Sequence, residues 1–254
     1  MKVIDEISLV DDLSKHLCSF PNPNSEVVPG IMWGLYGKLF TPAYWKAQYL
    51  LHSSPGLFAV HFKLGENILD EVVACILGGF GTRSEIGLAA YNRLKERKLI
   101  RNKVPYQLIH EALTEPYLIN NKPIHYRFPN QRAKFIYQFL ERDDLDNIPL
   151  QNDIDLRKWL VCNNGIGPKT ASWITRNFLN SDKVAIIDVH IFRALLLMGF
   201  YTRDYEIQRD YIKLEQIFIG FCHAIDVQPS KMDSLMWLQM KESNRMAIKV
   251  LSNA

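Results

Sequence analysis

The chain has 254 residues, 48% of them hydrophobic and 22% charged, so it can bury a full core as one or two closely joined units. Its net charge of only +3 permits a polyanionic partner without requiring one. No apolar run reaches the roughly 18 residues of a membrane span, and the first residues do not resemble a signal peptide, so we expect a cytoplasmic protein. The scattered cysteines show no spacing typical of a zinc site or an iron–sulfur cluster: Cys18, Cys75, Cys162 and Cys222.

The first part of the chain predicts a short helix over residues 8–17 and a loop rich in Pro and Asn over 20–30. An aromatic stretch follows, in which Thr41 and Pro42 fit a fresh helix start. Its aromatic residues have the spacing of one helical face: Trp33, Tyr36, Phe40, Tyr44, Trp45 and Tyr49. Such a face packs into a core or offers a wall on which a ring system stacks. Residues 57–64 fit either a short strand or a loop.

A buried helix is predicted over residues 68–77, ending at the glycine-rich stretch 78–81, and a second helix over 84–98 with Ser84 as its N-cap. The densest basic run ends that second helix and continues beyond it: Arg93, Lys95, Arg97, Lys98, Arg101 and Lys103. Such a run is either a solvated face or a set of phosphate contacts. We expect further helices over 104–117, 130–142 and 155–161, with a loop at 118–129.

Residues 163–172 read Asn-Asn-Gly-Ile-Gly-Pro-Lys-Thr-Ala-Ser and join two helices through a turn. Gly165 and Gly167 allow positive φ and the close approach of a foreign backbone, and Pro168 fits the first helical position. Exposed N–H groups at a helix N-terminus suit a phosphate. The pattern predicts a helix-hairpin-helix, and the glycines alone fit either a phosphate-binding hairpin or a merely tight helical turn.

Lys169 and Asp188, which both follow the turn, are candidate catalytic residues. Lys169 lies in the first turn of the second helix, where the positive end of the helix dipole favours the neutral, nucleophilic amine over the ammonium. The short buried run 184–187 leads to Asp188, which precedes another amphipathic helix and can serve as its N-cap. Taken separately, Asp188 is explained as a cap and Lys169 as a solvated or phosphate-pairing side chain.

Together, Gly-Ile-Gly-Pro-Lys at 165–169 and Ala-Ile-Ile-Asp-Val-His-Ile at 185–191 resemble the signature of the helix-hairpin-helix DNA glycosylase superfamily, in its bifunctional branch. The segments at 126–133 and 169–177 more narrowly resemble the compact archaeal-type 8-oxoguanine DNA glycosylase/lyases. This resemblance implies that the protein releases a damaged base, with 8-oxoguanine as the first choice, and then cuts the strand. In that reaction Lys169 attacks C1′ of the nucleotide and Asp188 assists.

The resemblance also implies roles for residues around these two. Expected DNA contacts are Gly165, Gly167, Thr170, His190, Arg193, Arg83, Arg127 and Arg132. The residue that fills the hole left by an extruded base would be Arg83, with Phe80 and Thr82 as alternatives. The base pocket would include Trp173, Asp233 and Trp237. Each has a simpler interpretation: Asp233 as part of a capping box that starts at Ser230, the tryptophans as core, and Arg127 and Arg132 as partners of Asp143 or Asp144.

We therefore expect a mostly α-helical fold with two helical subdomains and a DNA-binding cleft between them. Residues 69–186 would form the central subdomain with the hairpin, and residues 1–68 would pack with the helices of 187–254 to complete the second. No redox cofactor or catalytic metal is expected, and a cation held by hairpin carbonyls would be structural. The protein would act as a monomer on double-stranded DNA, associated with the nucleoid in a prokaryote.

Two other functions fit parts of the pattern. One is a glycosylase for another modified base, such as a hypermodified pyrimidine, because Trp173 is bulky for a pocket wall. The other is a non-enzymatic helix-hairpin-helix module that only binds DNA, which accounts for the glycines but gives no reason for Asp188.

Overall fold

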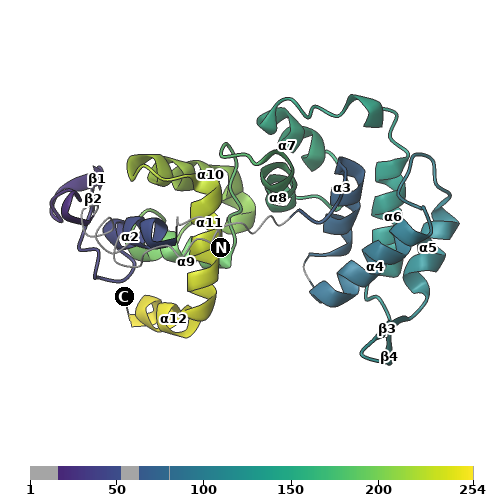
Figure 1. The fold of residues 1–254 in the computed structure, drawn as a ribbon, viewed down its shortest axis with the longest axis horizontal. Helices are drawn as coiled ribbons and strands as arrows, with labels where there is room; N and C mark the ends of the chain where they lie inside the picture. Colours follow the sequence, from purple (N-terminus) through teal and green to yellow (C-terminus); the bar gives the residue numbers. More distant parts are fainter. Residues whose placement is uncertain (1–16, 53–62, 80, 254) are drawn as a thin grey trace, which may run out of the picture. The chain divides into compact units, whose positions relative to one another are not determined.

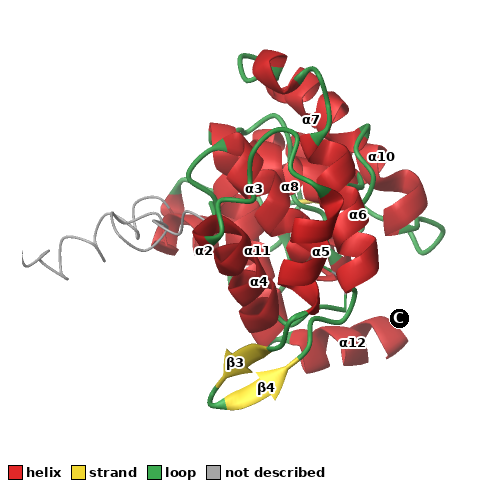
Figure 2. Ribbon diagram, turned by 90° about the vertical axis from the view of Figure 1, so that its right-hand side faces the viewer, coloured by secondary structure: helices red, strands yellow, loops and turns green. Residues whose placement is uncertain are grey.

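The computed structural model describes residues 17–79 apart from 53–62, together with 81–253, and the chain divides into two compact units (Figure 1). Unit 1 combines the chain up to residue 60 with residues 182–254, and unit 2 is residues 61–181. Both divisions come earlier than the predicted boundaries after residues 68 and 186. The fold is mostly α-helical, as predicted (Figure 2). No described helix has the length and apolar character that a membrane crossing requires.

Unit 1 begins with a small antiparallel hairpin where the sequence predicted a loop. The hairpin pairs β1 (Glu26–Val28) with β2 (Ile31–Met32). Gly30 provides the turn at φ +83°, and its N–H donates to Glu26 Oε1 at 3.0 Å. The described part of the unit contains helices α2 (Pro42–His52), α9 (Val189–Met198), α10 (Ile207–Ala224), α11 (Pro229–Glu242) and α12 (Asn244–Asn253).

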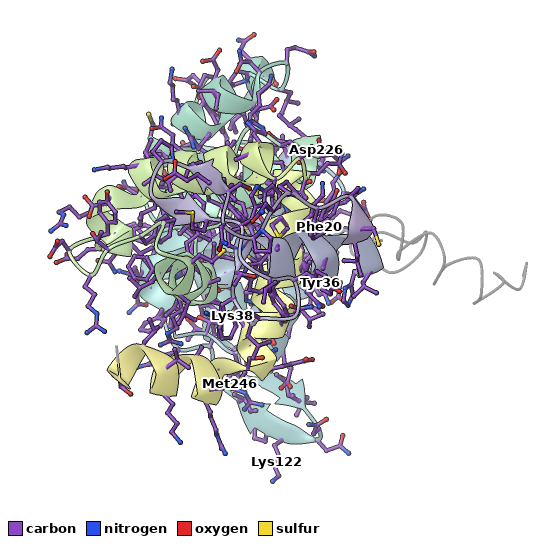
Figure 3. All side chains as sticks on the ribbon, turned by 90° about the vertical axis from the view of Figure 1, so that its left-hand side faces the viewer. Phe20, Tyr36, Lys38, Lys122, Asp226 and Met246 are labelled. Carbon is purple, nitrogen blue, oxygen red and sulfur yellow. The ribbon has the colours of Figure 1, made fainter. Side chains whose placement is uncertain are left out.

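The aromatic stretch is only partly helical. The predicted start of α2 is confirmed, because Tyr44 N–H donates to Thr41 Oγ1 at 3.1 Å. Trp33, Tyr36 and Phe40 lie before the helix, so the single helical face predicted for all six aromatics is wrong. Phe40 has φ +62°, a left-handed conformation that no helix interior accommodates. Tyr36 instead meets Phe20 edge-on, with ring centroids 6.3 Å apart (Figure 3).

Helix α2 packs against α11, which joins the two sequence segments of unit 1. Trp45 is fully buried in a core that includes Phe218 and Met236. At the edge of this core, Tyr44 Oη donates to Gln239 Oε1 at 3.1 Å. The predicted short helix at 8–17 lies outside the described residues except for Leu17, and the segment predicted at 57–64 lies outside them up to residue 62.

Unit 2 is a helical bundle with one hairpin (Figure 2). The hairpin was predicted as loop; it forms because Asn120 and Asn121 adopt positive φ of 51° and 60°, as a two-residue hairpin turn requires. The predicted helix at 68–77 is confirmed. The elements are α3 (Ile68–Leu77), α4 (Ser84–Glu96), α5 (Tyr106–Thr114), β3 (Tyr117–Ile119), β4 (Lys122–Ile124), α6 (Pro129–Leu140), the short 3₁₀ helix η1 (Leu145–Asn147), α7 (Asp153–Val161) and α8 (Pro168–Leu179).

Helix α3 lies in the core of unit 2, and its side chain Glu71 also binds the segment that precedes the helix. Its side chains Val72, Val73 and Ile76 are fully buried. Glu71, also fully buried, accepts hydrogen bonds from the N–H groups of Leu64 and Gly65, each at 2.7 Å. Burial raises the pKa of the Glu71 carboxyl, and these two hydrogen bonds oppose that rise.

The first half of the basic run serves unit 2 itself. Arg93 donates to the carbonyl oxygens of Ala112, Glu115 and Pro116 at 2.7–3.0 Å and lies 3.6 Å from the centroid of the Tyr117 ring. Arg97 donates to Glu115 Oε1 at 2.9 Å. These contacts fasten α4 to the start of the β3–β4 hairpin. The prediction that Ser84 caps α4 is wrong, because Ser84 is already helical and Arg83 occupies the N-cap position without a side-chain capping hydrogen bond.

An ionic contact joins the end of α6 to α7. Arg142 Nε donates to Asp144 Oδ1 at 2.7 Å, and Trp159 Nε1 donates to Asp144 Oδ2 at 2.7 Å. The guanidinium lies 4.5 Å from the centroid of the Trp159 ring. Hydrogen bonding from Arg142 lowers the pKa of the Asp144 carboxyl to about 2.

We predict that Asp144→Asn lowers the free energy of unfolding at neutral pH by less than about 1 kcal/mol, because solvent screens a half-exposed ion pair. A carboxyl whose pKa falls on folding stabilises the protein above its usual pKa of 3.8, and this contribution disappears as the pH falls through about 2. The difference between variant and wild type should therefore shrink between about pH 4 and pH 2 in chemical denaturation. A difference that does not depend on pH would contradict the assignment; Asp143→Asn, an exposed neighbour, is the control.

Candidate active site

The predicted helix-hairpin-helix is present in unit 2, formed by α7, the turn at 162–167 and α8. Asn163 closes the first helix: its Nδ2 donates to the carbonyls of Trp159 and Leu160 at 3.0 and 2.9 Å. Its own carbonyl accepts from Ile166 N–H at 3.1 Å, and Ile166 is buried. The side-chain amide of Asn163 and the buried side chain of Ile166 therefore stabilise the turn.

The two glycines of the hairpin do different things. Gly165 has φ +85°, and a Cβ there would lie 2.4 Å from Cδ2 of Phe135, so the position requires glycine. Gly167 has φ −86°, and no atom of the described residues would lie within 4 Å of a Cβ at this position. Of the two glycines that allow positive φ, only Gly165 therefore adopts it. Its open surroundings, at the N-cap of α8, leave the helix N-terminus accessible to an approaching group.

Lys169 is exposed in the first turn of α8. Within the described part of the chain, its Nζ forms no hydrogen bond or ion pair. Helix α8 buries its opposite face, including Ala171 and Ile174, against the core of unit 2. The lysine is thus presented outward from a rigid helix start, next to half-buried Thr170.

Asp188 belongs to unit 1 and is the N-cap of α9, as predicted. Its Oδ1 accepts from the N–H groups of His190 and Ile191 at 2.8 and 3.0 Å. Its Oδ2 forms no hydrogen bond or ion pair with any described residue. One oxygen therefore caps the helix, and the half-buried carboxylate retains a second oxygen for another interaction.

The run before Asp188 is held by side chains of α10 and α11. Ala185 N–H donates to Glu215 Oε1, Ile186 N–H to Asp233 Oδ2 and Ile187 N–H to Tyr211 Oη. Sequence analysis did not single out Tyr211 or Glu215. The available signal was an acidic residue, Glu215, beside Leu214 on the buried face of an amphipathic helix.

The expected DNA-binding arginines mostly have partners inside their own units. Arg83 pairs with Glu85 at 2.7 Å while 63% of its side chain is exposed. Arg127 Nη1 donates to the carbonyl of Gly81 at 3.4 Å, and Arg193 Nη1 donates to Asn244 Oδ1 at 2.5 Å.

Other side chains expected to contact DNA are placed less directly. Arg132 lies over Phe135, 6.0 Å from the ring centroid, and His190 is half-buried. The ion-pair partner of Asp144 is Arg142, rather than Arg127 or Arg132. Phe80 lies outside the described residues.

The three expected base-pocket residues also have defined surroundings. Trp173 is half-buried against the core of unit 2, and Trp237 against the core of unit 1, with Lys241 Nζ 4.7 Å from its ring centroid. Asp233 is only 3% exposed. The predicted capping box is wrong, because α11 begins at Pro229 and Ser230 N–H donates to Asp182 Oδ1 at 3.0 Å.

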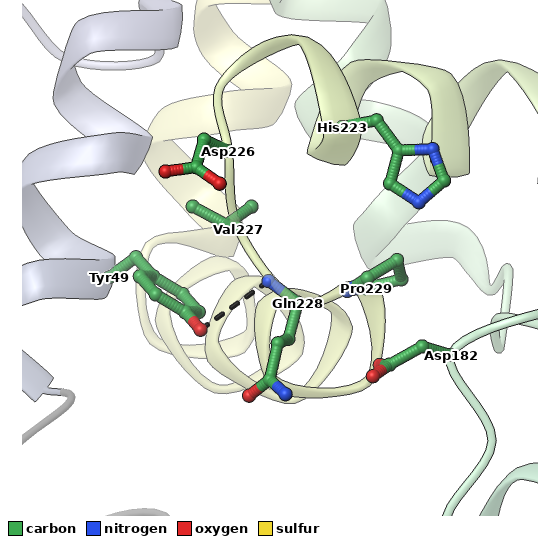
Figure 4. A pocket seen from close by; sticks show the side chains of 7 residues that line it. All are labelled: Tyr49, Asp182, His223, Asp226, Val227, Gln228 and Pro229. Carbon is green, nitrogen blue, oxygen red and sulfur yellow. Dashed lines mark hydrogen bonds between the residues drawn. The ribbon is translucent and has the colours of Figure 1, made fainter.

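A separate surface pocket of about 440 Å³ lies in unit 1 (Figure 4). Tyr49 Oη accepts from Gln228 N–H at 3.4 Å at its wall. The lining residues are Tyr49, Asp182, His223, Asp226, Val227, Gln228 and Pro229. None of them is among the predicted site residues.

Comparison with known proteins gives a consistent result. A family model described as 8-oxoguanine DNA glycosylase matches residues 59–227, a range that includes Lys169 and Asp188. The 8-oxoguanine DNA glycosylase/AP lyase of Fusobacterium nucleatum is 26% identical over 125 residues, covering 44% of this chain and 56% of the relative. This match thus spans little more than half of that relative's length.

Two further proteins extend the match. The 8-oxoguanine DNA glycosylase/AP lyase of Picrophilus torridus is 28% identical over 176 residues, covering 67% of this chain and 77% of the relative. The fold is similar to that of Methanocaldococcus jannaschii 8-oxoguanine glycosylase/lyase, solved in complex with 15mer DNA containing 8-oxoguanine. The TM-score is 0.54 at 24% identity, covering 72% of this chain and 86% of that one.

The two hairpin glycines allow a matched test. Gly165→Ala should lower the free energy of unfolding by at least about 1–3 kcal/mol, because strain at positive φ adds to the overlap with Phe135. Gly167→Ala should change it by no more than about 0.5 kcal/mol, because its φ is ordinary and its surroundings are open. Chemical denaturation of both variants measures the difference. Equal losses would show that the hairpin is built differently.

Proposed function

The chain belongs to the 8-oxoguanine DNA glycosylase family, and we propose that it excises 8-oxoguanine from double-stranded DNA and then cuts the strand at the abasic site. The observation that carries this proposal is the pair of Lys169 and Asp188. Lys169 is an exposed amine at a helix start without a partner among the described residues, and Asp188 keeps one carboxylate oxygen beyond its capping bonds. These are the two groups that a covalent base-excision reaction needs.

In the proposed first step, the amine of Lys169 attacks C1′ of the damaged nucleotide and the bond to the base breaks. The sugar gains positive charge as that bond loosens, and a nearby carboxylate such as Asp188 stabilises it. Asp188 also accepts the proton that Lys169 loses on forming the new C–N bond. The released base carries away the electron pair of the glycosidic bond.

In the second step, the sugar–amine adduct opens to a Schiff base between Lys169 and C1′. Loss of a proton from C2′ then expels the phosphate on the 3′ side, which cuts the strand by β-elimination. Water regenerates the free lysine. We propose no redox cofactor or catalytic metal for these steps, and a cation at the hairpin carbonyls stays a prediction.

The hairpin supplies the proposed grip on the DNA backbone. The open position of Gly167 and the N-terminus of α8 suit a phosphate, and Thr170 adds a hydroxyl beside them. Arg83 is exposed enough to exchange its bond with Glu85 for a DNA contact. The proposed base pocket draws on Trp173, Trp237 and Asp233, since an extruded base is read by stacking and by hydrogen bonds to its edge.

A module that only binds DNA is the competing function. It would use the hairpin in the same way, but it would give no role to Lys169, whose amine has no partner among the described residues. A glycosylase that activates water instead of an amine would likewise not need Lys169. The covalent intermediate separates these readings, because only the amine route links protein to DNA.

We predict that borohydride, added during turnover on a duplex containing 8-oxoguanine, traps wild-type protein on DNA by reducing the Schiff base. Lys169→Gln should give no adduct, yet it should bind DNA nearly as well, since one charge is lost from a contact set that spans the backbone. Gel mobility of the reduced complex measures the adduct. Lys158→Gln, an exposed lysine on the other helix of the hairpin, is the matched control and should trap normally.

Two other outcomes would change the proposal. Trapping that survives Lys169→Gln would mean that another amine is the nucleophile. Trapping on an abasic duplex but not on an 8-oxoguanine duplex would keep the chemistry and replace the substrate, with a hypermodified pyrimidine as the next base to test.

The proposed role of Asp188 separates from its capping role by substitution. Asp188→Asn keeps an oxygen that can accept from His190 and Ile191 N–H, so the free energy of unfolding should change by less than about 1 kcal/mol. Base release in single-turnover assays should nevertheless fall by roughly a hundredfold or more, because the charge that stabilises the sugar is gone. Normal base release by this variant would restrict Asp188 to capping.

A further inference from the structure

The segment that leads to Asp188 is held by side chains rather than by a neighbouring strand. Residues 185–187 belong to no strand, yet their three consecutive N–H groups are all hydrogen-bonded. The acceptors are Glu215 Oε1 for Ala185 at 3.0 Å, Asp233 Oδ2 for Ile186 at 3.2 Å and Tyr211 Oη for Ile187 at 3.2 Å. Side chains here do what a neighbouring strand does in a sheet.

Tyr211 makes one of these three contacts and a further bond to a carbonyl of the same segment. Its hydroxyl accepts from Ile187 N–H and donates to the carbonyl of Ala185 at 2.9 Å, so it spans the segment on both sides of Ile186. Tyr211 directly follows Asp210, whose φ and ψ of −106° and 15° break α10. Glu215 follows four residues later, on the same face of the helix. One stretch of α10 therefore presents both acceptors.

Apart from half-buried Ile186, the residues of this arrangement lie in the interior of unit 1. Ala185 and Ile187 are fully buried, and Tyr211 and Glu215 are 3% and 2% exposed. Water does not readily replace a hydrogen bond at such depth, so the segment keeps its path only while these side chains are in place.

Asp188 follows this segment directly. Its backbone is fixed on one side by Ile187 and on the other by α9, whose first N–H groups bind its Oδ1. The direction of Oδ2 is then set by the path of residues 185–187. We propose that Tyr211 and Glu215 are positioning residues for the Asp188 carboxylate, acting through the main chain; this inference rests on the proposed function.

The test removes one hydroxyl. Tyr211→Phe should slow single-turnover base release by about tenfold to a hundredfold, because a small displacement of a catalytic group has a large effect on rate, while the dissociation constant for the duplex stays unchanged. Tyr201→Phe is the matched control: Tyr201 is 2% exposed, and its hydroxyl donates to the carbonyl of Leu214 at 2.6 Å in the same core. It should lose comparable stability and keep its rate.

Glu215 provides a second, independent pair of variants. Glu215→Gln keeps an oxygen acceptor for Ala185 N–H and should release base at a rate close to wild type, whereas Glu215→Leu should be slowed like Tyr211→Phe. Rescue by glutamine would show that the hydrogen bond, and not the charge, is what the site uses. If Tyr211→Phe does not fold, this pair decides alone.

Amide hydrogen exchange at Ile187 gives a readout that does not need catalysis. The rate should rise in Tyr211→Phe and stay unchanged in Tyr201→Phe. Equal base release by the two variants, or unchanged exchange at Ile187, would overturn the inference. Wild-type protein that releases no base from any duplex would refute the proposed function instead, and exchange at Ile187 would then decide whether Tyr211 holds the segment.

Discussion

Buried main-chain groups that lack a partner in regular structure need hydrogen bonds from side chains or water, and in unit 1 this requirement fixes the path of the chain that leads to Asp188. In unit 1, the N–H groups of residues 185–187 donate hydrogen bonds to the side chains of Tyr211, Glu215 and Asp233. The side chain of Asp188 accepts from N–H groups in the first turn of α9. Without these bonds, the buried N–H groups of Ala185 and Ile187 would lose their acceptors, which is costly in the interior of a protein. The position of Asp188 therefore depends on polar contacts rather than on apolar packing alone.

In unit 2, the two helix ends at the hairpin differ in how their main-chain groups are satisfied. Asn163 satisfies the carbonyls at the end of α7, but the N-terminus of α8 receives no side-chain cap from Gly167. A helix start left open to solvent next to an exposed Lys169 suits an anionic ligand. Side chains therefore bind the main-chain N–H groups that precede Asp188, whereas no side chain caps the N-terminus of α8 beside Lys169.

The arginines illustrate how a structural role limits a functional one. The basic run with Arg93 and Arg97 fitted either a solvated face or a set of phosphate contacts, yet these two arginines fasten the β3–β4 hairpin to α4. Gly167, by contrast, has an ordinary φ, and a Cβ there would contact none of the described residues, so their packing does not require a glycine. A residue whose identity the fold does not require is the stronger candidate for a ligand contact.

The sequence by itself determined the helix-hairpin-helix, the start of α2 at Pro42 after Thr41, and the cap at Asp188, because caps, turn glycines and helical spacing act over a few residues. The sequence also predicted one helical face for all the aromatic residues from Trp33 to Tyr49, because no local pattern indicates the positive φ of Phe40. Only the tertiary structure decided what holds residues 185–187. Their partners lie 24 to 47 residues further along the chain, and contacts at that separation depend on how whole helices pack.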